Sequence, residues 1–373
     1  MNRALRTAAL VAASAALPLT AQAQSDAATG GVRFLSGFEA RSLSFDAGLG
    51  LKSAAEYAIP FSAIWTVSPR FALDFGVRYA SATRSPETSG ESNSTVSGFG
   101  DTQVRAVYQI VPDALVLTLG ANLPTGKTKL TDDELIAAGV VASELIPFPV
   151  PSFGSGANAT TGIAAAVPFA GWALGVGGSY RLSGSYTPVA SRDSAYKPGS
   201  ELRLRIGADR VIGQGRVSLG FTYSSFAEDE FGGSRIFQPG KRYISQASWS
   251  FPIGNLGVAL YAWDLYRSAG TVALGGAQTE KQNVLTAGAQ LSVRLGRNLL
   301  RPQIEFRQHA AGESSLEKAG QLFSLSARYQ MALSGSLTLS PALRYDVGNV
   351  VNASGDAIGF TGWGLSLGLR AAL

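Results

Sequence analysis

The chain has 373 residues with 44 Gly, no Cys, one His, 15% charged residues and a formal net charge of +5. Without Cys there is no disulfide framework, thiolate nucleophile or zinc–thiolate site, and one His excludes a multi-histidine metal centre, so we expect no metal and no cofactor. A soluble protein usually carries about 25% charged residues. We therefore expect much of the surface to face something other than water.

The N-terminus has the features of a secretory signal peptide, which predicts two segments: residues 1–23 as the signal and 24–373 as the mature domain. Arg3 and Arg6 give the positive start, Ala8–Leu19 is the short apolar run, and Ala21-Gln22-Ala23 is the cleavage site. Loss of the two arginines lowers the net charge from +5 to +3. No Lys/Arg cluster lies on one face, so no nucleic-acid partner is expected.

From about residue 38 onward, apolar and polar residues alternate with a period of two, which predicts β-strands. The first strand is expected within Phe38–Leu51. Later runs follow at 57–67, 71–79, 104–110, 172–178, 216–223, 337–346 and 360–373. The uncharged segment 145–180 is too rich in Pro and Gly for a membrane-spanning helix, and its second half alternates as a strand does.

The connections also alternate, between short turns and longer polar stretches. Short turns are predicted at 68–69, 112–113, 168–171, 213–215, 252–255, 296–298 and 334–336; longer loops are predicted at 81–97, 187–199, 227–240 and 310–320. Short turns on one rim and long loops on the other are typical of bacterial outer-membrane barrels. The prediction is an all-β, transmembrane antiparallel barrel of sixteen strands, with fourteen as the alternative. A soluble β-sandwich would carry more outward charge.

The last strand alternates to the C-terminus: Trp363, Leu365 and Leu367 are among the residues on one face, and Ser366 and Arg370 lie on the other. A terminal strand of this kind resembles the signal read by the barrel-assembly machinery, although Leu373 stands where Phe is usual. The expected partners are therefore outer-membrane lipid, this machinery and small-molecule solutes.

Charged residues in the inward phases are expected to line the lumen, because charge on the lipid face costs about 2–4 kcal/mol at the bilayer midplane. Two interpretations stay open: a basic ladder that favours anionic solutes, or a network that stabilises the wall. The predicted lumen residues are Arg70, Asp74, Arg78, Arg105, Arg203, Arg205, Arg216, Arg294, Glu305, Arg307, Arg328 and Arg344.

The longest loop is expected at about 124–156. Thr131 followed by Glu134 forms a capping box, which predicts a helix running to about Glu144, where three prolines then stop it. One hypothesis is that this loop folds over or into the lumen and narrows it. The alternative, slightly favoured on the sequence, is an external cap without a gating role.

Two further sequence features bear on nucleotide binding and on catalysis. Residues 121–128 approach a phosphate-binding loop, but they follow an alternating strand and contain Pro124, so the required strand-to-helix context is absent. His309 is the sole imidazole, and Ser314 and Ser315 lie near it in sequence, yet no nucleophile motif surrounds it. We expect no catalytic residues.

Two neighbouring segments carry a family resemblance. Gly98-Phe99-Gly100-Asp101-Thr102 opens a strand, Leu123-Pro124-Thr125-Gly126 closes the next, and a small Gly-rich step follows at 154–156. This resembles the outer-membrane barrels named for the MetA pathway of phenol degradation, and more loosely the transporters of fatty acids and aromatic hydrocarbons. The resemblance implies a passive channel without catalytic residues. The motif Gly and Asp residues are expected to be architectural, with Asp101 capping backbone donors and Gly126 supplying a positive φ.

Together these patterns predict a channel of the bacterial outer membrane for small solutes, aromatic or hydrophobic compounds among them. The alternative is a barrel enzyme that acts on lipid with His309 as base, and a third possibility is a structural or adhesive barrel.

Overall fold

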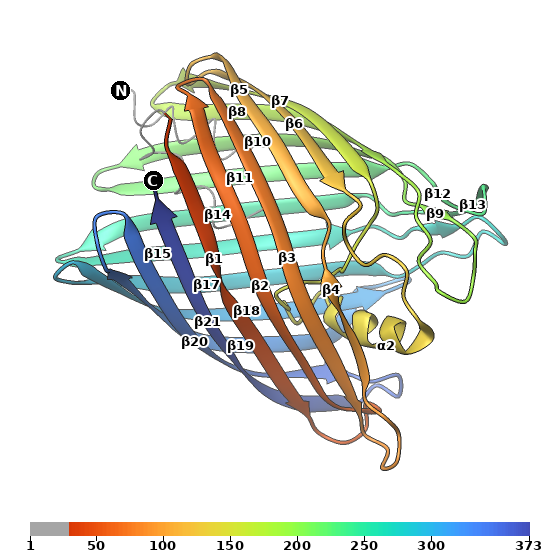
Figure 1. Ribbon diagram of the computed structural model, residues 1–373. Helices are drawn as coiled ribbons and strands as arrows, with labels where there is room; N and C mark the ends of the chain where they lie inside the picture. Colours follow the sequence, from red (N-terminus) through yellow and green to blue (C-terminus); the bar gives the residue numbers. More distant parts are fainter. Residues whose placement is uncertain (1–29) are drawn as a thin grey trace.

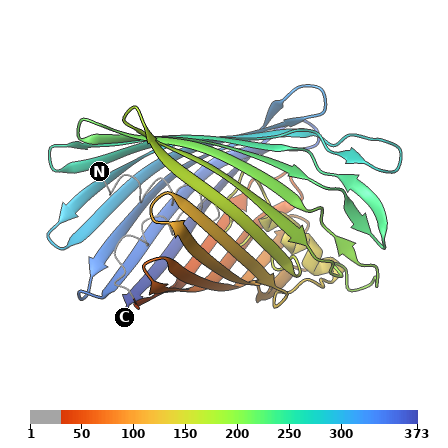
Figure 2. The same cartoon turned by 90° about the horizontal axis from the view of Figure 1, so that it is seen from above.

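The structure is a computed structural model that describes residues 30–373, so the predicted signal peptide lies outside the described residues. It is a closed, all-β antiparallel barrel (Figures 1 and 2). Closure comes from β1 (Val32–Phe45), which pairs antiparallel with β2 (Leu51–Ser68) on one side and with β21 (Ala357–Ala372) on the other. Among these residues, no helix has the length and apolarity needed to cross a membrane.

The other wall strands follow in chain order, each hydrogen-bonded to its neighbours in the wall. They are β3 (Phe71–Pro86), β4 (Ser94–Phe99), β5 (Thr102–Val111), β6 (Leu115–Leu123), β7 (Asn158–Phe169), β8 (Trp172–Ser183), β10 (Glu201–Ile212), β11 (Gly215–Phe226), β14 (Arg242–Ile253), β15 (Leu256–Arg267), β17 (Lys281–Leu295), β18 (Asn298–Gly312), β19 (Glu317–Ala332) and β20 (Leu337–Val351).

Within residues 30–373 the barrel has 16 strands, because β4 and β5 are successive parts of one wall position. β4 pairs with the far half of β3, and β5 pairs with its near half. The prediction of sixteen strands is confirmed, and the alternative of fourteen is wrong.

The two rims differ as the sequence predicts. The seven short turns lie on the rim that carries the end of β21, here called the turn rim, and all seven predicted positions are confirmed. The opposite loop rim carries α2 (Asp132–Val141) and a small external sheet (Figure 1). That sheet joins three loops through β9 (Tyr196–Lys197), β12 (Asp229–Phe231), β13 (Ser234–Gln238) and β16 (Thr271–Val272).

Some predicted boundaries are wrong. The first strand begins at Val32 rather than Phe38, and most of the loops expected at 81–97 and 310–320 are strand. Polar residues mislead there because the strands extend past the apolar band towards the loop rim, where both faces of the wall can be polar.

Side-chain alternation sorts the wall into an apolar outer face and a polar inner face. On β20, Leu343 and Tyr345 are 66% and 54% exposed on the outside, whereas Asp346 on the inside is fully buried. The same pattern recurs on the other strands, where exposed Leu, Ile, Val and aromatic residues occupy the outward phase. An apolar outer face suits hydrocarbon, and closure through β1 and β21 pairs the first strand of the wall with the last.

Candidate functional site

The residues that carry the family resemblance meet at one place, the base of the loop 124–157. Asp101 lies in the break between β4 and β5. Its carboxylate accepts hydrogen bonds from the backbone N–H of Gly126 (3.0 Å) and from the backbone N–H and hydroxyl of Ser155 (2.6 and 3.1 Å). Thr102 and Thr125 share a hydrogen bond of 2.8 Å beside it. The carboxylate therefore ties both ends of the loop to the wall.

Gly126 has a different role from the one expected. Its φ is not positive, so the expectation of a left-handed turn residue is wrong. A Cβ at this position would lie 2.5 Å from the Phe153 carbonyl oxygen and 2.6 Å from Asp101 Oδ1. Glycine is needed here because backbone segments from the two ends of the loop approach each other closely.

The loop contains α2, which begins where the sequence predicts and ends at Val141, three residues before the expected Glu144. Thr131 accepts from the Glu134 N–H, and the Glu134 carboxylate accepts from the Thr131 N–H, so the capping box is confirmed. Burial raises the pKa of Glu134, but hydrogen bonds from Lys127 and the Thr131 N–H outweigh it, leaving this pKa below its ordinary value.

After α2, which lies at the loop rim, the chain enters the barrel, so the structure supports the hypothesis that this loop folds into the lumen and not the alternative of an external cap. Five apolar side chains of this segment are at most 7% exposed: Leu145, Ile146, Phe148, Val150 and Phe153. They pack in one cluster with inward residues of the wall: Leu43, Ala54, Ala58, Ala80, Ala82, Val96, Leu322 and Phe360. The small alanines on β2 and β3 leave the space that these side chains fill, and burial of this apolar surface favours insertion.

Polar contacts fix the inserted segment to the wall. Arg41 on β1 donates to the Pro147 carbonyl, and its guanidinium lies 5.8 Å from the centre of the Phe148 ring. Glu56 on β2 accepts from the Val150 N–H at 2.9 Å. On another part of the wall, Arg267 of β15 donates to Glu144 at 2.7 Å.

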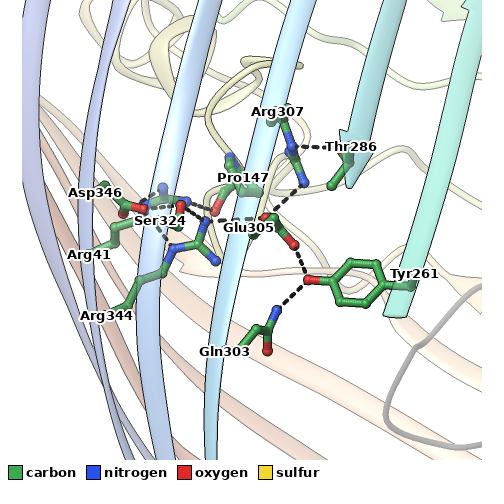
Figure 3. Close-up of polar contacts among 10 residues, drawn as sticks. All are labelled: Arg41, Pro147, Tyr261, Thr286, Gln303, Glu305, Arg307, Ser324, Arg344 and Asp346. Atoms are coloured by element: carbon green, nitrogen blue, oxygen red, sulfur yellow. Dashed lines mark hydrogen bonds and ion pairs between the residues drawn. The ribbon is translucent and has the colours of Figure 1, made fainter. Parts of the chain in front are cut away.

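Arg41 also belongs to a polar network on the inner wall, whose other side chains come from β15, β17, β18, β19 and β20 (Figure 3). The buried Asp346 accepts from Arg41 (2.8 Å), Arg344 (2.8 Å) and Ser324 (2.6 Å). Arg344 also lies 3.5 Å from Glu305.

Glu305 extends the network along the wall (Figure 3). It lies 3.7 Å from Arg307 and accepts from the Tyr261 hydroxyl at 2.9 Å. Arg307 also donates to Thr286 and stacks 5.1 Å from the centre of the Trp263 ring. Because each carboxylate is shared by two or three partners, the side chains of this network hold one another in place, with three arginines against two carboxylates.

The wall formed by β8, β10, β11, β14 and β15 is also rich in arginine on its inner face, and the inserted segment does not fill the space beside it. Six arginines and two carboxylates occupy its inward phases: Arg181, Arg203, Arg205, Arg216, Arg242 and Arg267, with Glu201 and Asp209. On β14, the inward Gln246, Ser248 and Ser250 are exposed. The inserted segment therefore covers one side of the lumen and leaves this basic side open.

The remaining predicted residues are spread around the wall. Asp74 and Arg105 form an ion pair on neighbouring strands. Arg78, Arg294 and Arg328 share the inward phase of their strands and lie outside the network of Figure 3. Arg70 does not belong to a strand: it is an exposed residue of the β2–β3 turn, because β3 starts only at Phe71.

Arg41, Glu56 and Arg267 hold the inserted segment and were missed by the sequence analysis. The alternation of side chains along the strand indicates that two of them face the lumen: Arg41 alternates with the apolar Phe38 and Ala40, and Glu56 alternates with Tyr57. His309 faces the lumen on β18, and its Nε2 is buried without a hydrogen-bond partner among residues 30–373. In that part of the chain, no cluster of three His, Asp or Glu side chains is placed to hold a metal.

Neither a family model nor a curated protein matches this chain, so the resemblance to the MetA-pathway barrels stays a prediction. Among solved structures, the chain is similar to the CymD monoaromatic hydrocarbon channel, with 14% identity, 97% of this chain and 93% of that chain covered, and a TM-score of 0.49.

It is also similar to an anion-selective porin from Comamonas acidovorans, with 14% identity, 92% and 98% coverage and a TM-score of 0.43. A third similar structure is OmpT, an outer membrane protein of Vibrio cholerae, with 11% identity, 94% and 99% coverage and a TM-score of 0.43. Similarity at this level says nothing about the solutes of this chain.

Proposed function

We propose that this chain is a channel of the bacterial outer membrane through which small solutes diffuse passively, with a preference for anions. The observation that carries the proposal is the asymmetric lumen: one side is filled by the inserted segment, and the other is exposed at β14 and lined by six arginines against two carboxylates. Arginine-lined pores attract anions.

The placement in the outer membrane draws on three features. The outer face of the barrel is apolar, the N-terminal sequence has the pattern of an export signal, and the last strand resembles the signal for the barrel-assembly machinery. The motif residues at the loop base favour the MetA-pathway type of barrel, in which small aromatic compounds are candidate solutes.

Ion selectivity in planar bilayers tests the proposal. The reversal potential in a KCl gradient should show chloride preferred over potassium, and Arg205→Gln with Arg216→Gln should reduce this preference because two lumen cations are lost. Swelling of liposomes that carry the barrel, with neutral, anionic and aromatic solutes, measures permeation directly. A barrel that passes none of these solutes is not a channel, and a cation-selective barrel contradicts the anion preference.

The alternative of a lipid-acting enzyme has no specific observation in its favour. Among the described residues, no Ser, Asp or Glu forms a hydrogen bond with His309, and Ser314 and Ser315 are exposed in the loop between β18 and β19. A base that activates a nucleophile needs both partners within hydrogen-bond reach.

A further inference from the structure

The mouth of the barrel at the loop rim holds a cavity of about 520 Å³ whose lining shares no residue with the network of Figure 3. Its floor comes from the loop-rim ends of β8, β11, β14, β15 and β17, and its roof comes from the external sheet. Pockets for small molecules commonly measure about 300–1,000 Å³. This one is therefore large enough for a small organic solute.

The roof is held in place by a buried carboxylate. Asp229 on β12 is 8% exposed, and it accepts hydrogen bonds from the Tyr196 hydroxyl (2.6 Å) and from the Gly199 N–H (2.7 Å). Gln238 on β13 donates to the Phe226 carbonyl at 2.8 Å, which joins the roof to the wall. Both oxygens of Asp229 accept hydrogen bonds, so this residue shapes the cavity.

Three arginines line the cavity, and they differ in how their charge is balanced. Arg181 lies 3.6 Å from Glu201, and Arg267 donates to Glu144. In residues 30–373, no carboxylate lies within ion-pair distance of Arg242, and its buried Nε has no hydrogen-bond partner. Its guanidinium lies 5.5 Å from the centre of the Phe226 ring, which orients it. Arg242 is thus an oriented cation that forms no ion pair with a carboxylate of residues 30–373.

The rest of the lining is rich in rings. Phe226, Phe237 and Tyr196 contribute aromatic side chains, and Pro198 and Pro239 add flat apolar surfaces. The other carboxylate in the lining, Glu280, is exposed at the rim. A guanidinium pairs with a carboxylate through two parallel hydrogen bonds, and ring surfaces favour an aromatic group beside it.

We infer that this cavity binds a small carboxylate that carries one aromatic ring. Arg242 holds the carboxylate, and the rings of Phe226, Phe237 and Tyr196 enclose the aromatic group. The inference deepens the proposed function, because such a solute would be captured at the mouth before it passes the basic wall.

Calorimetric titration of the full chain in detergent micelles tests the inference with three probes: benzoate, benzyl alcohol and acetate. Benzoate should bind, and the two other probes should bind at least about tenfold more weakly, because benzyl alcohol lacks the carboxylate and acetate lacks the aromatic ring. Arg242→Gln should weaken benzoate binding by about tenfold or more and leave benzyl alcohol unchanged. Phe226→Leu should weaken benzoate less strongly.

Arg328→Gln is the matched control, because it removes the same charge from an inward position near the turn rim and should leave benzoate affinity unchanged. Resistance to unfolding in SDS without heating shows that each variant is folded. Absence of benzoate binding, equal binding of benzyl alcohol or acetate, or equal losses in the Arg242 and Arg328 variants would overturn the inference. The titration measures binding and does not depend on transport of the solute through the barrel. A barrel that conducts anions but does not bind benzoate contradicts only the proposed binding site. A barrel that binds benzoate but conducts no ions contradicts only the proposed channel function.

Discussion

Asp101 and Ser155 are 54 residues apart in the chain, and the Asp101 carboxylate accepts two hydrogen bonds from Ser155, at 2.6 Å from its backbone nitrogen and 3.1 Å from its hydroxyl. Together with the bond from Gly126, this contact closes the base of the loop whose middle lies inside the barrel. One carboxylate at a strand break therefore fixes the position of the segment that fills one side of the lumen.

Asp101→Ala should loosen this loop without unfolding the barrel. Hydrogen bonds to a charged acceptor are worth about 1.5–3 kcal/mol each, so loss of three should favour loop opening by about 3 kcal/mol or more. Limited proteolysis in lipid vesicles should show new cleavage within 124–157. Glu313→Ala, at an exposed carboxylate in the loop between β18 and β19, is the control. Equal cleavage in the two variants would show that Asp101 does not hold the loop.

Deletion of residues 131–147 should raise single-channel conductance, since it removes α2 together with Glu144, Leu145 and Pro147, which contact the wall. The relevant measurement is conductance in planar bilayers at fixed salt, with the intact chain as reference. Unchanged conductance in a folded variant would mean that the inserted segment does not narrow the passage.

Asp346→Ala should destabilise the barrel by about 3–5 kcal/mol, because it leaves the buried Arg41 without its carboxylate partner. Both Arg41 and Arg344 donate to this carboxylate, which is fully buried. Urea unfolding in lipid vesicles measures the change. Asp356→Ala, at an exposed loop position, should change the free energy of unfolding by no more than about 0.5 kcal/mol. Comparable losses in both variants would contradict the role of the buried network.

The start of α2 should be pH-dependent. The pKa of Glu134 lies below its ordinary value of 4.5, chiefly because the hydrogen bonds from Lys127 and Thr131 outweigh burial. The ionised carboxylate therefore stabilises the helix fully above pH 4.5, and this stabilisation is lost as the pH falls through the lowered pKa.

Hydrogen exchange of the α2 amides at pH 6 and at pH 3 measures this loss. Glu134→Gln should remove most of the difference, whereas Asp133→Asn should keep it. Thr131→Ala should cost the helix about 1 kcal/mol at either pH, since the capping hydroxyl is neutral. The same pH difference in the Glu134 variant would assign the effect to another group.

Glu144→Gln should increase the preference for anions. Glu144 is the carboxylate that pairs with Arg267 on the open side of the lumen, so its neutralisation leaves that guanidinium uncompensated. Reversal potentials in a KCl gradient should move further towards the value for chloride. Glu313→Gln, in the exposed loop after β18, should leave the potential unchanged. A shift towards potassium in the Glu144 variant would contradict the proposed basic pathway.

The individual residues show where sequence reasoning succeeds. Arg344 was placed on the inner face from its alternation with Leu343 and Tyr345, and the structure has it there. Arg41 alternates with Phe38 and Ala40, but the sequence does not show that the wall opposite it is filled by a segment more than 100 residues later, so its role was missed. The cavity around Arg242 could not be predicted, because its lining comes from five wall strands and three loops that meet only when the barrel closes.

The barrel, its sixteen strands, the short turns and the capping box of α2 can all be predicted from the amino-acid sequence. All of these follow from local rules: side chains alternate every second residue, lipid excludes charge from one phase, and Thr with Glu three residues later caps a helix. Tertiary structure alone decided what fills the lumen. Whether Leu145 and Phe148 lie outside or inside depends on the space beside Ala54 and Ala80 and on an arginine from β1, and these groups meet only across a closed wall.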